Sequence, residues 1–274
     1  MDHSLTVGDA PWGVCANTTL GKIFVANSSD ASITKFDAAD PTNTALQSTI
    51  SLPTDPLYLD YFETDSVLYV TTAENDYPLI VKENADGSTT VDTLIDSRLR
   101  LIQTGSKVLV DDANQRLYVS EVGNYAAGLW QYDLSGGGTA PSFALSITQG
   151  ALGYGMQDLA LVPPANDEIL VAATSPYSVT VVNATTLAPS DSLETGPYPN
   201  AVAVSPDGST AYVSLSSSDV QSWDLATGTL QQTYHFAEPV NRGGVKISPD
   251  GSFLVVATYN STTRDSRICL IYMQ

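Results

Sequence analysis

Basic residues, histidine and cysteine are scarce in this chain, and long apolar runs are absent. Of its 274 residues only 11 are Lys or Arg, against 30 Asp or Glu, which gives a net charge of −19. A field of that sign repels nucleic acids and anionic lipids, so we expect neither as a partner. No apolar stretch approaches the roughly 20 residues of a membrane helix, so we expect no membrane span.

The few histidines and cysteines restrict the chemistry further. The only histidines are His3 and His235, so a Ser–His–Asp triad has one realistic base, His235, and no Ser-containing elbow accompanies it. The sequence contains neither a Cys/His metal-binding cluster nor a glycine-rich phosphate loop. The two cysteines, Cys15 and Cys269, lie near the two ends of the chain. Two buried thiols or one disulfide would both fit them.

What the chain does have is a short repeat. Its two clearest copies cover residues 200–214 and 243–257, and both contain the segment Ser-Pro-Asp-Gly-Ser. Weaker copies hold Phe24, Tyr69, Tyr118 and Leu170 where the clear ones hold Tyr212 and Val255. The spacings are 45, 49, 52, 42 and 43 residues, and the distance from Val255 past the C-terminus to Phe24 is again 43. Six similar intervals that close on themselves predict a six-bladed β-propeller rather than an open solenoid.

Each repeat reads as four short antiparallel strands. In residues 199–236 they are expected at 201–204, 211–214, 219–223 and 230–234, with turns at Ser205-Pro-Asp-Gly208 and Asp224-Leu-Ala-Thr-Gly228. The turn aspartate recurs as Asp37 and Asp133, with Asn183 in its place in the fourth repeat. The predicted fold is therefore all-β, with four antiparallel strands in each of six blades.

The repeat also predicts how the chain is divided. We expect one propeller domain over residues 1–274, with blades at about 11–55, 56–101, 102–150, 151–197, 198–238 and 239–274 together with 1–10. The last repeat lacks a fourth strand, and the spare segment Ser4-Leu-Thr-Val7 precedes the first. We predict that this N-terminal strand completes the last blade and closes the ring, because pairing would remove two exposed sheet edges.

The segment from Pro199 through Asp207-Gly208 to Trp223-Asp-Leu-Ala-Thr-Gly228 resembles the YVTN propeller repeats and the gluconolactonase-type six-bladed propellers. Members of the gluconolactonase family hold a divalent cation with one Glu, two Asn-type ligands and one Asp. Asn200 matches the Pro-Asn element of that family. However, Leu215 and Ser216 stand where the family has its Asp, and Asp9-Ala-Pro-Trp12 replaces its Glu-Gly-Pro. A metal-dependent lactonase is therefore an alternative only, and we expect no metal.

In size, blade number and acidic surface, the chain is also similar to the fungal propeller-fold hetero-Diels–Alderases. That resemblance implies a metal-free and cofactor-free pocket, which orients two apolar partners and polarises a carbonyl group. The leading expectation is a cyclase for an intermolecular hetero-Diels–Alder reaction in natural-product biosynthesis, with a small uncharged organic substrate. A non-enzymatic secreted binding propeller is a further alternative.

Site residues are expected at the channel mouth, where the connections before strand a and after strand b open. Twelve positions before the repeat's aromatic position, and three after it, lie two sets of six residues: Trp12, Leu57, Ser106, Asp158, Asn200 and Gly243, and then Asn27, Thr72, Glu121, Ala173, Leu215 and Thr258. Few of these are charged, which suits an uncharged organic ligand.

Three residues are candidates for catalysis. Asp158 and Glu121 come from neighbouring repeats and could form an acid pair, and Arg242 could polarise a carbonyl oxygen. The ligand-binding candidates are Trp12, Asn27, Tyr58, Ser106, Tyr154 and Asn200. Most have an ordinary alternative: solvated loop acids for Asp158 and Glu121, and a surface ion pair for Arg242. For Trp12 it is a wedge between blades, for Asn200 a turn cap, and for Tyr58 and Tyr154 core or rim packing.

Four N-glycosylation sequons begin at Asn17, Asn27, Asn183 and Asn260. We expect glycans on Asn17, Asn183 and Asn260, with Asn183 best placed in an exposed turn. At Asn27 a glycan would cover the expected mouth, so one of the two interpretations must fail there. The start Met1-Asp-His-Ser-Leu5 lacks a signal peptide's apolar centre. We expect either a secreted protein whose leader is not part of this sequence or a cytoplasmic one.

Overall fold

The computed structural model describes residues 6–17, 19–40, 43–73, 77–99, 107–120, 128–260, 262 and 265–273. These residues form antiparallel β-sheets joined by turns, with one four-residue helix, α1 (Gln149–Leu152), and two short 3-10 segments, η1 (Thr44–Leu46) and η2 (Glu63–Asp65). The fold is an all-β, six-bladed propeller, as the repeat predicts.

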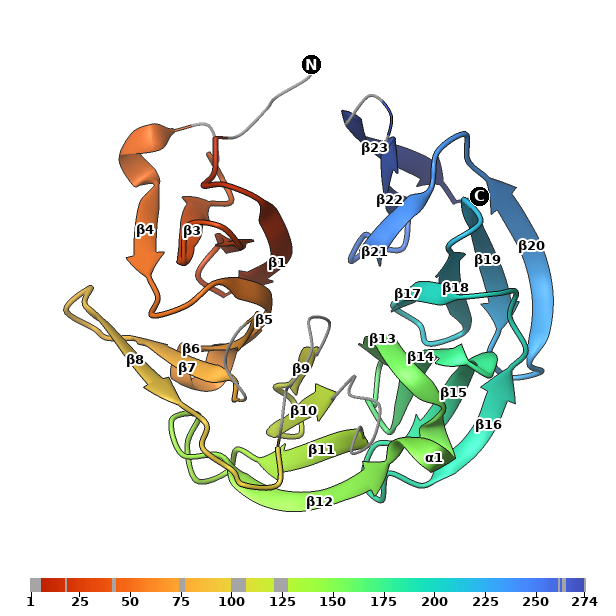
Figure 1. Cartoon of the computed structure of the whole chain (residues 1–274), viewed down its shortest axis with the longest axis horizontal. Coiled ribbons are helices and arrows are strands. Elements are labelled where there is room, and N and C mark those ends of the chain that lie inside the picture. Colours follow the sequence, from red (N-terminus) through yellow and green to blue (C-terminus); the bar gives the residue numbers. More distant parts are fainter. Residues whose placement is uncertain are drawn as a thin grey trace. The chain divides into compact units, whose positions relative to one another are not determined.

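The sheets follow one another along the chain (Figure 1). The first three consist of β1 (Pro11–Asn17), β2 (Lys22–Asn27), β3 (Ser32–Asp37) and β4 (Ser48–Ser51); β5 (Pro56–Phe62), β6 (Val67–Thr72), β7 (Leu79–Glu83) and β8 (Thr89–Thr93); and β9 (Val108–Asp111), β10 (Arg116–Ser120), β11 (Gly128–Asp133) and β12 (Ser142–Thr148). The last three consist of β13 (Tyr154–Leu161), β14 (Glu168–Ser175), β15 (Tyr177–Asn183) and β16 (Pro189–Leu193); β17 (Pro199–Val204), β18 (Thr210–Leu215), β19 (Asp219–Asp224) and β20 (Thr229–His235); and β21 (Val240–Ile247), β22 (Phe253–Asn260) and β23 (Asp265–Tyr272).

The repeat's aromatic position is the third residue of the second strand in every sheet. Phe24, Tyr69, Tyr118 and Leu170 are fully buried, and Tyr212 is nearly so. In the fifth sheet, β17 to β20 contain the four expected strands, each longer by one or two residues at its ends. The predicted strand order and turns are confirmed there.

The turn aspartates act as predicted, by bonding their own backbone. Asp224 Oδ1 accepts from the Thr227 amide at 2.8 Å, and Asp133 and Asp37 accept from the amide two residues further on. Asn183 takes over this role in its sheet, because its Oδ1 accepts from the amides of Thr185 and Thr186. Such bonds hold the chain reversal after the third strand without help from the core.

The sixth sheet has three strands among the described residues. The predicted fourth strand, Ser4–Val7, begins outside the described residues, and Thr6 and Val7 carry no strand assignment. The last strand, β23, leaves Ile268, Leu270 and Tyr272 exposed. The pairing of the N-terminal segment with this sheet stays a prediction.

By its internal contacts the chain divides into two compact units. Unit 1 comprises residues 1–123 and 130–144, and unit 2 comprises residues 124–129 and 145–274. A single domain over the whole chain therefore stays a prediction. Within unit 1 the first strand β5 contacts both β1 and β9, and within unit 2 β17 contacts both β13 and β21. First strands in contact, with later strands outside them, are the arrangement of propeller blades.

Apolar side chains fill the spaces between neighbouring sheets inside each unit. In unit 1 one cluster joins the first two sheets around Phe24 and Leu68, and another joins the second and third around Phe62 and Leu117. Unit 2 has equivalent clusters between its sheets. A small sheet cannot bury its apolar face alone, so this stacking supplies the core.

Two further sequence expectations concern the thiols and membrane spans. Cys15 on β1 and Cys269 on β23 are both of intermediate burial, and no disulfide joins them. Across the residues that the structure covers, no helix has the length and apolar character needed to cross a membrane.

Candidate functional site

The predicted mouth residues of unit 1 share one edge of their sheets. The start of each first strand pairs with the end of the second: Pro11 lies opposite Asn27, and Pro56 opposite Thr72. Residues just inside the first strands therefore lie beside the ends of the second strands, as the repeat alignment predicts. This edge is where Trp12 and Tyr58 meet.

Trp12, Tyr58 and Lys107 form a compact group, which we call the first-strand cluster. The Trp12 and Tyr58 rings lie 6.4 Å apart between centroids and are inclined at 76°, an edge-to-face contact. The Lys107 ammonium lies 3.4 Å from the Tyr58 ring centroid, a close cation–π contact. The residues come from β1, β5 and the position just before β9, so three consecutive blades contribute to the cluster.

Two residues of the cluster are buried and held by hydrogen bonds, and the third is exposed to solvent. Tyr58 and Lys107 are buried, whereas Trp12 is 52% exposed. The Thr71 hydroxyl bonds both backbone groups of Tyr58, at 3.2 and 3.4 Å, and the Ser120 hydroxyl accepts from the Lys107 amide at 2.9 Å. Tyr58 and Lys107 are thus held in place, and Trp12 offers an aromatic surface to solvent.

Glycine is required beside Trp12. A Cβ on Gly13 would lie 2.4 Å from the Leu57 carbonyl oxygen and 3.0 Å from the Tyr58 Cα. No other residue allows β1 to approach β5 so closely, and this approach brings Trp12 to Tyr58.

Asn27 was expected to contact ligand, but its side chain is buried and fully engaged. Its Oδ1 accepts from the Gly8 amide at 3.1 Å, and its Nδ2 donates to the hydroxyls of Ser32 and Thr34, both at 2.9 Å. Asn27 therefore positions the segment that leads into Trp12. A glycan on Nδ2 does not fit this packing.

In unit 2, Asp158 and Asn200 link the first strands of neighbouring blades. Asp158 is buried, and its Oδ2 accepts from the Val202 amide at 3.1 Å. The Asn200 Nδ2 donates to the Val240 carbonyl oxygen at 3.0 Å. Both side chains have a structural task, and their proposed contacts with substrate stay predictions.

Three other predicted positions cannot be placed in the same way. Glu121 and Ser106 lie outside the described residues, as does the side chain of Arg242. The expected acid pair of Asp158 with Glu121 and the carbonyl-polarising role of Arg242 therefore stay predictions.

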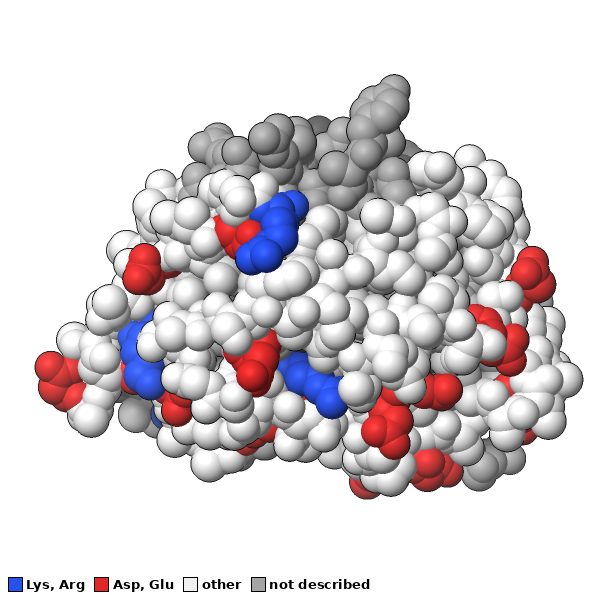
Figure 2. Space-filling view, turned by 90° about the horizontal axis from the view of Figure 1, so that it is seen from below, with Lys and Arg blue, Asp and Glu red and all other residues white. Residues whose placement is uncertain are grey.

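Tyr154 is exposed at the rim of a separate cavity in unit 2. This cavity has a volume of about 450 Å³ and is formed by α1, β15 and β16. It contains the carboxylates of Asp191 and Glu194 but no basic residue, since the chain has no Lys or Arg from Leu117 to Asn241. On the face shown in Figure 2 acidic side chains are widespread and basic ones are few. Tyr154 does not belong to the first-strand cluster.

The cation site of the lactonase alternative finds no set of ligands among the residues that can be described. Within them no three His, Cys, Asp or Glu side chains gather closely enough to hold a metal ion. Asn200, the one position that matches the family's ligands, is bonded to a backbone carbonyl instead.

The predicted glycosylation sites differ in exposure. Asn17 has 1% of its surface exposed, and its Oδ1 accepts from the Leu20 amide at 2.7 Å. This burial argues against a glycan at Asn17, and glycosylation there stays a prediction. Asn183 and Asn260 are partly exposed, and glycosylation there stays a prediction.

Lys107 was missed by the sequence analysis. It lies one position beyond the aligned mouth position Ser106, and equivalently Tyr58 lies one beyond Leu57. Because Tyr58 and Lys107 occupy the same position in consecutive repeats, a comparison of the two repeats at that position would have identified Lys107.

Comparison with known proteins supports the fold. No protein-family model matches the chain, and no curated protein matches it significantly. Three solved structures are similar over nearly the whole chain. Hydrazine synthase from Kuenenia stuttgartiensis is 14% identical with a TM-score of 0.63, covering 99% of this chain and 98% of that one.

The other two solved structures have no function in their descriptions. A functionally unknown protein from Desulfotomaculum acetoxidans is 12% identical with a TM-score of 0.69, covering 98% of this chain and 92% of that one. A protein from Lactobacillus plantarum is 17% identical with a TM-score of 0.72, covering 100% and 86%. At such identities the likeness establishes the propeller fold and nothing finer.

Proposed function

We propose that this propeller binds a small, planar, uncharged organic molecule at the first-strand cluster. The observation that carries this proposal is the half-exposed Trp12, held edge-to-face against Tyr58, whose ring in turn packs on the Lys107 ammonium. An exposed indole on a fixed base is a stacking surface for a flat ligand.

The positive charge of Lys107 influences which ligands the cluster prefers. The Lys107 ammonium creates a fixed positive potential in a largely buried setting, where electrostatic interactions are stronger than in water. A ligand stacked on Trp12 with a carbonyl group directed toward the blades is favoured over a plain hydrocarbon. This preference agrees with a neutral carbonyl compound as substrate.

As the specific activity we propose an intermolecular hetero-Diels–Alder cyclisation without a cofactor. In this reaction a heterodiene and an alkene form two new σ bonds together, and no atom leaves. The protein's contribution is to hold both partners in a reactive orientation, which can supply several kcal/mol of barrier lowering. Positive potential at the carbonyl oxygen supplies more, because electron density grows there in the transition state. The sequence resemblance and the first-strand cluster together support this assignment.

Binding can be tested with coumarin, a neutral planar carbonyl compound, by isothermal titration and tryptophan fluorescence lifetime. Trp130 and Trp223 are buried, so quenching by a bound ligand reports mainly on Trp12. We expect Trp12→Ala to weaken binding about tenfold, and Trp12→Phe to weaken it less. Tyr272→Ala, which removes another exposed aromatic residue, serves as the control. Equal affinity in Trp12→Ala and wild type would reject this site.

Turnover needs a separate assay, with a quinone methide generated in solution and a cyclic terpene alkene as partner. We expect Lys107→Met to lower the rate of cyclisation about 100-fold, and Lys107→Arg to retain part of it. Coumarin binding without cyclisation by the wild type would reject the cyclase activity while leaving the binding site intact. Lactone hydrolysis by the wild type that stops after chelation would instead favour the lactonase-type metal chemistry.

A further inference from the structure

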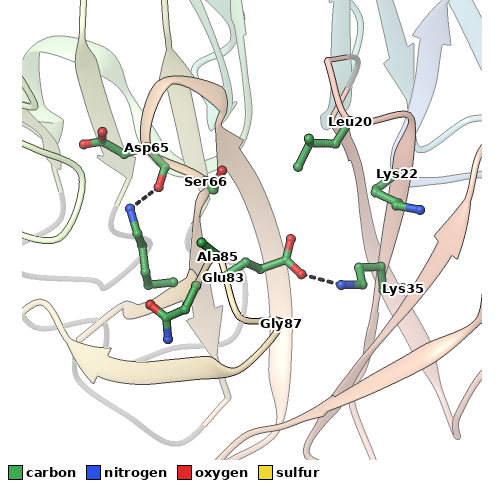
Figure 3. A pocket seen from close by; sticks show the side chains of 10 residues that line it. Leu20, Lys22, Lys35, Asp65, Ser66, Glu83, Ala85 and Gly87 are labelled. Carbon is green, nitrogen blue, oxygen red and sulfur yellow. Dashed lines mark hydrogen bonds and ion pairs between the residues drawn. The ribbon is translucent and has the colours of Figure 1, made fainter.

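A second cavity, in unit 1, lies away from the first-strand cluster. It has a volume of about 580 Å³ and opens between the first and second sheets, as Figure 3 shows. Its lining comes from the start of β2, from β3, from the turn before β6 and from the end of β7. These positions form the edge of the sheets opposite to Trp12 and Asn27, so the cavity is independent of the proposed function. We call it the basic cleft.

The basic cleft concentrates the scarce basic residues. The chain has five lysines, and three of them, Lys22, Lys35 and Lys82, line this one cavity. Lys22 and Lys35 come from the first sheet and Lys82 from the second. Asp65 and Glu83 also line the cavity, so three basic and two acidic side chains face it in a chain of net charge −19. At physiological salt, charges beyond about 8 Å are screened, so a ligand in the cleft senses mainly these five groups.

Two of the three lysines are neutralised by carboxylates. The Lys22 ammonium pairs with Asp37 at 2.8 Å. Lys35 pairs with Glu83, and this ion pair crosses the cleft from one sheet to the other (Figure 3). Both lysine side chains are about three-quarters buried.

Lys82 is different, because its partner is neutral. Its ammonium donates to the backbone carbonyl oxygen of Asp65. The Asp65 carboxylate is used elsewhere, since its Oδ2 accepts from the Gly138 amide at 2.6 Å. Among the described residues no carboxylate forms an ion pair with Lys82, so the partly buried ammonium has only a neutral partner.

We propose that the basic cleft binds a compact oxyanion, the phosphate or carboxylate group of a small molecule. The anion accepts hydrogen bonds from Lys82 and from the remaining protons of Lys35, since an ammonium group has three donors. It supplies the negative charge that Lys82 lacks, and charge-assisted bonds of this kind are about twice as strong as neutral ones. The Glu83 carboxylate competes with the ligand for Lys35.

The test is titration of inorganic phosphate, and separately of succinate, into the full chain by calorimetry. We expect Lys82→Gln to weaken binding at least tenfold and Glu83→Gln to tighten it several-fold, because the glutamine frees the charge of Lys35. Lys246→Gln serves as the matched control, since Lys246 is an exposed strand lysine outside the cleft. Thermal unfolding of each variant establishes that it is folded.

The two cleft variants are expected to change the binding affinity in opposite directions, which separates the proposal from its alternatives. A merely structural role for Glu83 predicts weaker binding in Glu83→Gln, and that outcome would overturn the proposal. Equal losses in Lys82→Gln and Lys246→Gln would overturn it as well, because they indicate general attraction to the surface. Preference for phosphate over succinate, or the reverse, identifies which oxyanion the cleft takes.

Discussion

At the scale of single residues, the two clearest repeats contain the same hydrogen-bonded turn. In the first, Asp207 Oδ1 accepts from the Ser205 hydroxyl at 2.6 Å and from the Ser209 amide at 3.0 Å. In the second, Asp250 Oδ1 accepts from the Ser252 amide at 3.0 Å and its hydroxyl at 2.8 Å. The side-chain bond from Ser205, followed by the bonds from Ser209, lowers the pKa of Asp207 from 3.8 to about 2. The equivalent bonds of Ser248 and Ser252 lower the pKa of Asp250 equally.

These turns predict a pH dependence with a definite sign. Because the folded-state pKa lies below the value of 3.8, the ionised carboxylate stabilises the fold above about pH 4. That contribution is lost as the pH falls from about 4 towards 2. Asp207→Asn lacks it, so the stability difference between wild type and variant should shrink over this range. Urea unfolding at several pH values measures it, and a constant difference would contradict the prediction.

At the scale of elements, polar side chains fasten the first strand of one blade to the next. In unit 2 these are Asp158, which bonds the Val202 amide, and Asn200, which bonds the Val240 carbonyl. In unit 1 Asp60 does the same, since its Oδ2 accepts from the Val110 amide at 2.7 Å. The apolar clusters join neighbouring sheets, first strands included, and these directional bonds add to them at the first strands.

We predict that Asp158→Ala destabilises the protein by about 1–3 kcal/mol, because it leaves the buried Val202 amide without its acceptor. Asp158→Asn keeps an acceptor oxygen and should cost less. Urea unfolding of both variants, with the exposed Asp191→Ala as control, measures this difference. If Asp158→Ala were as stable as wild type while cyclisation disappeared, the role of Asp158 would lie in catalysis and not in joining β13 to β17.

The elements also show what the sequence could and could not reveal. The spacing of Phe24, Tyr69 and Tyr118 was enough to predict the blades, because a buried second strand recurs once per sheet. The functional site was harder to predict from the sequence. A position in the repeat alignment indicates which sheet edge a residue occupies, but not which groups its side chain contacts. Asn27 lies at the sheet edge beside the start of β1, where the alignment put it, yet its amide bonds Ser32 and Thr34.

The basic cleft could not have been found by such an alignment. Its lysines come from different strands of two sheets, and nothing in the sequence relates Lys22 or Lys35 to Lys82. They become neighbours only when the first two sheets stack. The same is true of the ion pair between Lys35 and Glu83, whose partners are 48 residues apart.

At the scale of the whole molecule, the net charge of −19 opposes folding by self-repulsion. We predict that added KCl raises the unfolding temperature, because counter-ions screen this repulsion in the compact state. Each kcal/mol gained should raise Tm by about 2–4 °C. Thermal scans in low and high KCl measure the effect. A Tm that falls with salt would show that the surface ion pairs outweigh the repulsion.

The stretch without Lys or Arg from Leu117 to Asn241 has a practical consequence. It contains β11 to β20, whereas four of the five lysines lie in unit 1. Trypsin therefore finds no cleavage point in this stretch, even in fully denatured protein, and releases one large fragment that begins after Arg116. Amine-reactive dyes and cross-linkers will likewise mark the first three blades almost exclusively, which gives a simple way to label unit 1.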